Sequence, residues 1–168
     1  MSDYINDRCE YELVSLLREK NITVATCESC TGGLISKRIT NVPGASEVFG
    51  YGVCTYANEA KIKLLSVCED TLNNYGAVSE QTAIEMAKGM VMLSGADIAI
   101  STTGIAGPGG GSPEKPVGLV YTAYYTKDGK CGCKKLLLGD IDDPNRENIR
   151  FAASCEAMNF AIEYIRRL

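Results

Sequence analysis

Two spacings of apolar residues recur along the chain, and they predict an alternation of helices and strands. Leu13, Leu16 and Leu17 share one face of a helix over residues 4–19. Comparable spacing or capping signals predict further helices over 30–41, from Asn58 to Leu65, from Ser79 to about 93, and after Asp143. Shorter, mainly apolar runs predict strands at 22–27, 49–56, 97–102, 117–125 and 131–138.

Turn and cap residues indicate where several of these elements begin and end. Asp128-Gly129 between the last two strands is typical of a hairpin. Ser79 is expected to cap its helix, and Asp143 to cap the last helix with Pro144 at the first helical position. The element order predicts an α/β fold, a three-layer α/β/α arrangement with a mixed sheet in a single domain over residues 1–168.

Composition and charge narrow the classes of function. The 168 residues are 45% hydrophobic and 23% charged, the balance of a globular protein with a real core. The net charge of -4 and the pI of about 5.0 argue against a nucleic-acid partner. No apolar run reaches membrane-spanning length and the N-terminus lacks a signal-peptide core, so a cytoplasmic protein with reduced cysteines and no membrane partner is expected.

The most informative stretch begins at Cys27, where the first strand gives way to a turn and a helix. A serine at this junction, Ser29, lies beside backbone N–H groups that can hold an oxyanion or a phosphate. Taken alone, such a serine is more often a helix cap than a nucleophile. The chain contains no histidine. A nucleophilic Ser29 would therefore need a lysine or tyrosine to accept its proton.

Several blocks of sequence, spaced along the whole chain, resemble one family. They are Glu28-Ser29-Cys30-Thr31-Gly32-Gly33, Val42-Pro43-Gly44-Ala45-Ser46, Tyr56-Ala57-Asn58-Glu59-Ala60-Lys61, Gly76-Ala77-Val78-Ser79, Thr103-Gly104-Ile105-Ala106-Gly107-Pro108-Gly109-Gly110-Gly111 and Pro113-Glu114-Lys115-Pro116-Val117-Gly118. Together they look like the CinA C-terminal domain family, the nicotinamide-nucleotide amidases, over about residues 5–167.

The resemblance implies a bacterial enzyme that hydrolyses the carboxamide of nicotinamide mononucleotide to nicotinic acid mononucleotide and ammonia. It implies a three-layer α/β/α fold, a homodimer, a small-molecule nucleotide as partner, and no metal or other cofactor. Some members of the family carry an additional N-terminal domain, which this sequence is expected to lack.

The same resemblance assigns catalytic roles to three residues. Ser29 becomes the expected nucleophile, with the N–H groups of Cys30 and Thr31 receiving the oxyanion. Lys61 is the expected base: with Asn58 as N-cap it is the third residue of its helix, where the positive end of the helix and burial both lower the pKa of an amine. Tyr56 is hypothesised to relay the proton or to orient Lys61. A solvated lysine and an ordinary strand tyrosine are the plainer alternatives.

Further residues are predicted to bind the substrate. Gly32 and Gly33 are expected to leave space for a ligand, and Gly104 to shape the pocket floor. The hydroxyls of Ser46 and Thr103 match family positions that face the ligand, although loop capping would explain them too.

Two arginines near the start of the last helix are candidate anion binders. The family usually runs Gly-Asp-Arg, whereas this chain has Gly139-Asp140-Ile141-Asp142-Asp143-Pro144-Asn145-Arg146. We interpret this as an insertion that displaces the arginine to Arg146, in the first turn of the helix. Arg150 is expected to be a solvated arginine on an exposed face.

Other functions remain as alternatives. A non-catalytic nucleotide-binding or regulatory domain would use the same glycine loops without needing a Tyr56/Lys61 pair. Cys27 and Cys30 have the spacing of a zinc or redox site that Cys131 and Cys133 would complete, which is the least favoured option. The segment 109–116 fails as a P-loop because Glu114 and Pro116 replace residues that the phosphate chemistry needs.

Overall fold

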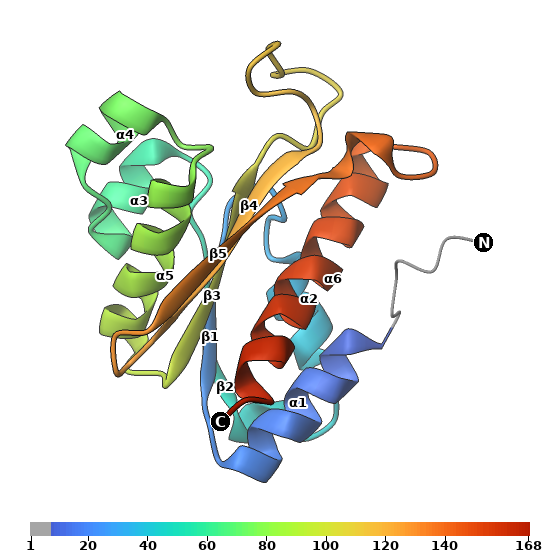
Figure 1. The fold of residues 1–168 in the computed structure, drawn as a ribbon. Coiled ribbons are helices and arrows are strands. Elements are labelled where there is room, and N and C mark those ends of the chain that lie inside the picture. Colours follow the sequence, from blue (N-terminus) through green and yellow to red (C-terminus); the bar gives the residue numbers. More distant parts are fainter. Residues whose placement is uncertain (1–7) are drawn as a thin grey trace.

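The computed structural model describes residues 8–168, and its central feature is a five-stranded mixed sheet in the order β2-β1-β3-β4-β5 (Figure 1). β1 lies parallel to β2 and β3, while β4 lies antiparallel to both β3 and β5. The strands are β1 (Val24–Glu28), β2 (Phe49–Cys54), β3 (Ile98–Gly104), β4 (Leu119–Thr126) and β5 (Cys131–Leu137). The predicted mixed sheet is confirmed.

Helices cover both faces of the sheet, as the element order predicts (Figure 1). One face carries α1 (Cys9–Lys20), α2 (Leu34–Thr40) and α6 (Arg146–Ile165). The other carries α3 (Asn58–Leu65), α4 (Glu69–Tyr75) and α5 (Glu80–Ser94). Two short 3-10 helices, η1 (Ala45–Glu47) and η2 (Leu138–Asp140), precede β2 and follow β5. The part of the expected first helix that falls on residues 4–7 lies outside the described residues.

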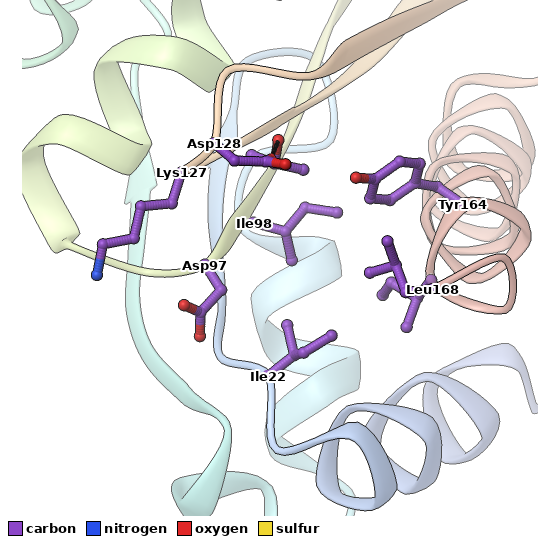
Figure 2. A pocket seen from close by; sticks show the side chains of 9 residues that line it. Ile22, Asp97, Ile98, Lys127, Asp128, Tyr164 and Leu168 are labelled. Atoms are coloured by element: carbon purple, nitrogen blue, oxygen red, sulfur yellow. Dashed lines mark hydrogen bonds between the residues drawn. The ribbon is translucent and has the colours of Figure 1, made fainter.

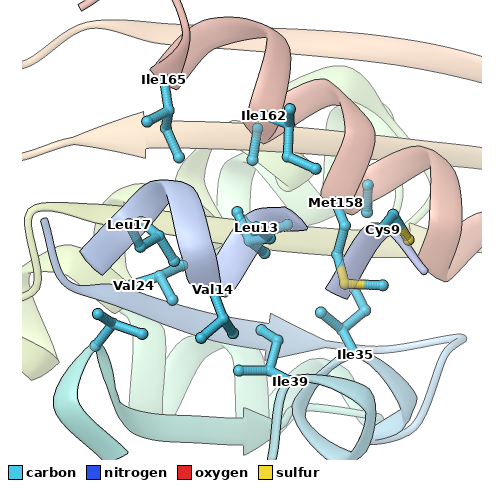
Figure 3. Close-up of a cluster of buried hydrophobic side chains, with 14 of the residues drawn as sticks. Cys9, Leu13, Val14, Leu17, Val24, Ile35, Ile39, Met158, Ile162 and Ile165 are labelled. Carbon is cyan, nitrogen blue, oxygen red and sulfur yellow. The ribbon is translucent and has the colours of Figure 1, made fainter. Parts of the chain in front are cut away.

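The core consists of two apolar layers separated by the sheet. On the first face Leu13 and Leu17 of α1 pack with Ile35 of α2 and Met158 of α6 (Figure 3). On the second face Met86 and Met90 of α5 belong to a separate cluster against the sheet. Burying side chains of this size stabilises the fold by about 1.5–3 kcal/mol each.

Two element boundaries differ from those expected, whereas a third agrees. Asn145 caps α6 by accepting a hydrogen bond from the Asn148 N–H at 2.9 Å, so neither Asp143 nor Pro144 takes the position predicted for it. α2 begins at Leu34 rather than at residue 30, because residues 30–33 form a turn. Ser79 does cap α5, as predicted, by accepting the Thr82 N–H at 3.2 Å.

Helix α4 was not predicted. Its seven residues show no apolar periodicity. The hydrogen bonds that stabilise its first turn come from a residue of another helix. The carboxylate of Glu85 on α5 accepts hydrogen bonds from the Cys68 N–H at 2.8 Å and the Thr71 hydroxyl at 2.6 Å. Such a cap depends on tertiary contact, which no local sequence signal contains.

Candidate active site

The topology brings four chain segments to one edge of the sheet. Because β1, β2 and β3 are parallel, the residues that follow them, Ser29, Thr55 and the loop after Gly104, meet at their carboxyl ends. β5 runs in the same direction as β3, so the chain also reaches this edge before Arg146 opens α6. The loop between β3 and β4 projects beyond this edge (Figure 1).

Ser29 and Lys61 are in contact at this edge. The Lys61 Nζ lies 3.2 Å from the Ser29 Oγ. Lys61 is only 1% exposed and Ser29 only 8%, so neither is a solvated surface residue. A lysine without an acidic partner is rarely buried to this extent. The structure therefore brings together the two residues that the sequence analysis named as nucleophile and base.

The surroundings of Lys61 favour a neutral amine. Burial lowers the pKa of Lys61 from its ordinary value of 10.5. Its Nζ lies 2.7 Å from the carbonyl oxygen of Thr55 and 3.3 Å from that of Tyr56. A neutral amine has two N–H groups, which these carbonyls accept, and one lone pair, which then faces the Ser29 hydroxyl. In this form the Lys61 amine is able to accept a proton from the Ser29 hydroxyl.

Helix α3 aims Lys61 into the site. Asn58 is the first residue of α3 and Ala57 occupies the N-cap, so Lys61 is the fourth residue of the helix and not the third as expected. Its N–H is already bonded to the Ala57 carbonyl at 3.3 Å. Gly89 of α5 lets α3 approach, because a Cβ at that position would overlap the backbone of Leu65. Burial of the amine, and not a position at the free end of a helix, is the cause of its lowered pKa.

Glu28, which sequence reasoning did not single out, organises the turn that carries Ser29. This fully buried carboxylate accepts hydrogen bonds from the Thr31 hydroxyl at 2.7 Å and the Gly33 N–H at 3.1 Å. It also accepts the N–H of Ile35 at 3.0 Å, and the N–H and hydroxyl of Ser36 at 2.9 and 2.8 Å. Glu28 thus caps α2 from the preceding strand and fixes the turn between them.

Arg150 holds the same turn from the other side, which corrects the expectation of a solvated arginine. It is half-buried, and its guanidinium donates to the carbonyl of Cys30 at 3.2 Å and to that of Thr31 at 2.7 Å. In a trans peptide the N–H points away from the carbonyl, so fixing the Cys30 carbonyl also fixes the direction of the Thr31 N–H. Arg150 is therefore a positioning residue for this turn.

Two backbone donors in the turn are not bonded to oxygen. Among residues 8–168, no backbone carbonyl accepts the N–H groups of Cys30 and Thr31, which instead face the sulfur of Cys30. The next two N–H groups are occupied, because Gly32 donates to the Ser29 carbonyl at 3.1 Å and Gly33 donates to Glu28. Gly33 has a φ of 92°, which favours glycine. The conformation of the turn accounts for both glycines without a ligand.

Tyr56 and Arg146 form a separate pair at the rim. The Arg146 guanidinium donates to the Tyr56 hydroxyl at 2.8 Å and to the Gly107 carbonyl at 2.6 Å. Tyr56 is 62% exposed. It is the backbone carbonyl of Tyr56 that contacts Lys61, while the phenol is engaged with Arg146. The Tyr56 phenol therefore lies beside Arg146, the candidate anion binder. This position does not support a proton relay between Ser29 and Lys61.

Thr103 and Gly104 lie at the carboxyl edge but have structural partners. The Thr103 hydroxyl donates to the Ala77 carbonyl at 2.7 Å, which ties the segment before α5 to β3. A Cβ at Gly104 would lie 2.6 Å from the carbonyl oxygen of Leu119, so glycine is required by the packing of β4. These contacts give Thr103 and Gly104 a structural role next to the site.

Ser46 is not brought to the site within this chain, contrary to the expectation for it. It lies in η1, before the amino end of β2, whereas Ser29 follows the carboxyl end of the parallel strand β1. The sheet therefore separates the two residues by the length of a strand.

A cavity lies at the edge of the sheet opposite Ser29. It has a volume of about 400 Å³ and is lined mainly by apolar side chains, with Ile22, Ile98, Tyr164 and Leu168 pointing into it (Figure 2). Asp97 stands at its margin, where its carboxylate accepts the Thr23 N–H at 2.9 Å. Unlike this cavity, the Ser29 site combines a serine hydroxyl with a buried amine.

The cysteines that suggested a zinc or redox site in the sequence are not arranged as such a site. Across residues 8–168, no three His, Cys, Asp or Glu side chains are grouped as a metal site requires. Burial raises the pKa of the Cys30 thiol to about 12, so this neighbour of Ser29 stays protonated and weakly nucleophilic. In that same described part of the chain, every helix is too short or too polar to cross a bilayer.

The fold and this site define a class: three-layer α/β proteins with a buried serine–lysine pair at the carboxyl edge of a mixed sheet. The particular family follows from comparison with known proteins. A family model described as the CinA C-terminal domain matches residues 6–165, and the chain belongs to this family. The predicted resemblance is confirmed.

Related proteins are described as CinA-like or as competence-damage inducible proteins. A "CinA-like protein" of Kosmotoga olearia is 52% identical over 155 residues, and a "putative competence-damage inducible protein" of Clostridioides difficile is 54% identical over 144 residues. These matches cover 92% and 86% of this chain, but only 35% and 33% of the relatives. The chain thus spans about a third of the length of these two proteins.

Solved structures show the same fold. The competence/damage inducible protein CihA of Agrobacterium tumefaciens is 41% identical with a TM-score of 0.89, and the match covers 97% of this chain and 98% of that one. A CinA superfamily protein of Klebsiella pneumoniae is 30% identical, also with a TM-score of 0.89, over 95% and 97% of the two chains. These likenesses confirm the predicted α/β/α class.

Proposed function

We propose that the chain is a nicotinamide-nucleotide amidase, which hydrolyses the carboxamide of nicotinamide mononucleotide to nicotinic acid mononucleotide and ammonia. The single observation that supports this most is the contact of 3.2 Å between the Lys61 amine and the Ser29 hydroxyl in a buried setting. The choice of substrate comes from the family resemblance. The choice of reaction is supported by the chemistry of the pair, because a serine activated by a neutral amine attacks a carbonyl carbon.

The reaction proceeds in two halves. Lys61 takes the proton of Ser29 as the Ser29 Oγ attacks the carboxamide carbon, and the N–H groups of Cys30 and Thr31 hold the oxyanion. When the C–N bond breaks, Lys61 returns this proton to the leaving nitrogen, which departs as ammonia. A water molecule, deprotonated by Lys61, then attacks the acyl-enzyme. The proton passes back to the Ser29 Oγ as the carboxylic acid product leaves.

The nucleotide part of the substrate is placed at the rim. Arg146 is exposed, lies at the first position of a 20-residue helix, and is oriented by the Tyr56 hydroxyl and the Gly107 carbonyl. An arginine beside a helix N-terminus suits the phosphate of a mononucleotide. In this proposal Arg146 and Tyr56 bind substrate, and Ser29 and Lys61 carry out the chemistry.

The test is ammonia release from nicotinamide mononucleotide by the purified chain. The wild-type chain should release ammonia, and Ser29→Ala should lose about 100-fold or more of that rate because the nucleophile is gone. Ser94→Ala is the matched control, since the Ser94 hydroxyl is bonded to the Met90 carbonyl at the end of α5, away from the site. Its rate should stay close to wild type.

Two results would contradict the proposal. Binding of the mononucleotide without ammonia release at any pH from neutral to alkaline would favour a non-catalytic nucleotide-binding domain. Retention of most of the activity by Ser29→Ala would show that another group attacks the amide.

A further inference from the structure

A buried polar cluster lies on the face of the sheet covered by α1, α2 and α6, and the proposed amidase does not use it. At its centre is Arg38 of α2, which is 4% exposed. Its guanidinium donates to the Glu10 carboxylate of α1 at 2.6 Å and to the Ser154 hydroxyl of α6 at 2.8 Å, and it lies 4.5 Å from the centre of the Phe151 ring. A charge so deeply buried requires partners on several sides.

Two cysteine sulfurs complete this cluster. Arg38 Nη1 lies 2.8 Å from Cys155 Sγ on α6, and Arg38 Nη2 lies 3.3 Å from Cys9 Sγ on α1. The Cys9 thiol donates a hydrogen bond to the Glu10 carboxylate at 3.8 Å, and the two thiols interact with each other. Both residues belong to one packed core cluster, and Cys9 lies at the end of α1 beside α6 (Figure 3). One guanidinium therefore holds together two sulfurs that are 146 residues apart in the sequence, at positions 9 and 155.

The two sulfurs are chemically different. The hydrogen bond from Cys9, together with that from Arg38, lowers the pKa of Cys155 to about 7. The same bond raises the pKa of Cys9, which burial raises further. Glu10 also faces the pair, and its carboxylate opposes a thiolate at either position. The pair thus combines an attacking thiolate with a protonated thiol, the arrangement that disulfide formation needs.

We propose that Cys9 and Cys155 form an oxidisable dithiol, which a small hydroperoxide converts to a disulfide joining α1 to α6. The Cys155 thiolate attacks one peroxide oxygen, the O–O bond breaks, and a sulfenic acid forms while the leaving oxygen takes a proton. Cys9, having lost its proton, then attacks the Cys155 sulfur, so that an S–S bond forms and the S–O bond breaks to give water. With hydrogen peroxide, two thiols and one peroxide give one disulfide and two waters.

Access to the pair comes through the start of α1. Both cysteines are buried in the closed fold, at 0% and 1% exposure. Cys9 is the first residue of α1, and the terminal turns of helices open most readily. Opening of this single turn exposes Cys9 and the sulfur behind it without unfolding the sheet. The modification is therefore expected to be slower than oxidation at an exposed thiol but specific in its product.

The experiment uses the whole chain, fully reduced and then treated with one equivalent of hydrogen peroxide. After alkylation under denaturing conditions, digestion and mass spectrometry should find a peptide in which Cys9 is linked to Cys155. Cys155→Ser should lose this product. A double variant, Cys131→Ser with Cys133→Ser, is the matched control, because it removes a pair of cysteines on β5 and should leave the rate of Cys9–Cys155 linkage unchanged.

The pH dependence of the linkage rate distinguishes a Cys155 thiol with a lowered pKa from an ordinary thiol. With a Cys155 pKa of about 7, the rate of linkage should rise about tenfold between pH 6 and pH 8 and then level off. An ordinary thiol would keep gaining rate beyond about pH 8.5. The proposal is overturned if the linked peptide is absent, if it makes up no larger share of the disulfide products than in the urea-unfolded chain, or if its rate does not level off.

Discussion

Replacing Lys61 by methionine should lower the rate of ammonia release by about 100-fold or more, because the base next to Ser29 is lost while the volume of the side chain is kept. The fold should survive. Removing a buried amine relieves a desolvation cost, and this offsets the lost hydrogen bonds to the Thr55 and Tyr56 carbonyls. The free energy of unfolding at pH 7 should therefore change by less than ~2 kcal/mol. Activity assays and urea denaturation of the same preparation measure the two effects.

Lys63→Met is the matched control for this substitution. Lys63 lies two residues further along α3 and is exposed, so its replacement should keep the activity within about twofold of wild type. A Lys61→Met variant that is folded and still active would remove the proposed base. Equal losses in the two lysine variants would instead point to a general effect on the helix.

Replacing Glu28 by glutamine should destabilise the protein by about 2–4 kcal/mol, the largest expected effect on stability. The carboxylate accepts five hydrogen bonds, three of them from the backbone N–H groups of Gly33, Ile35 and Ser36. A glutamine amide turns one acceptor into a donor that faces these donors. Urea denaturation should show a lower midpoint with an unchanged slope.

Glu47→Gln provides the comparison for Glu28. Glu47 pairs with Arg18 at 3.0 Å, but its side chain is 58% exposed, so the change should cost no more than about 0.5 kcal/mol. If Glu28→Gln proved as mild as Glu47→Gln, the cap at the start of α2 would not be what holds the Ser29 turn. A Glu28→Gln chain that fails to fold at all would agree with the prediction, provided that Glu47→Gln folds.

The layout of strands and helices could be predicted from the sequence because its signals are local. The apolar runs, the cap at Ser79 and the Asp128-Gly129 turn each act within a few residues, and all three are confirmed. Helix α4 and the start of α2 could not be predicted in the same way. Their ends are held by Glu85 and Glu28, which reach them from other elements.

The same distinction between local sequence signals and tertiary contacts applies to the residues of the candidate site. The resemblance to a family identified Ser29 and Lys61, and the fold brings them together. The role of Arg150 depends on the packing of α6 against the turn, so its position in the sequence predicted only an exposed helix residue. One signal for Glu28 was available, since an acidic residue directly before a serine at a strand end is costly to bury without donors. The expected homodimer stays a prediction.

The central claim is that Ser29 faces an amine that burial keeps ready to accept a proton. Lysine side chains labelled with ¹³C at Cε can be titrated by NMR, and the Lys61 signal assigned by its absence in Lys61→Met. We expect Lys61 to titrate below its ordinary pKa of 10.5. Since the folded state then loses this proton first, the free energy of unfolding should also rise with pH up to that value, an increment missing in Lys61→Met. A Lys61 that titrates at 10.5 or above would contradict the account.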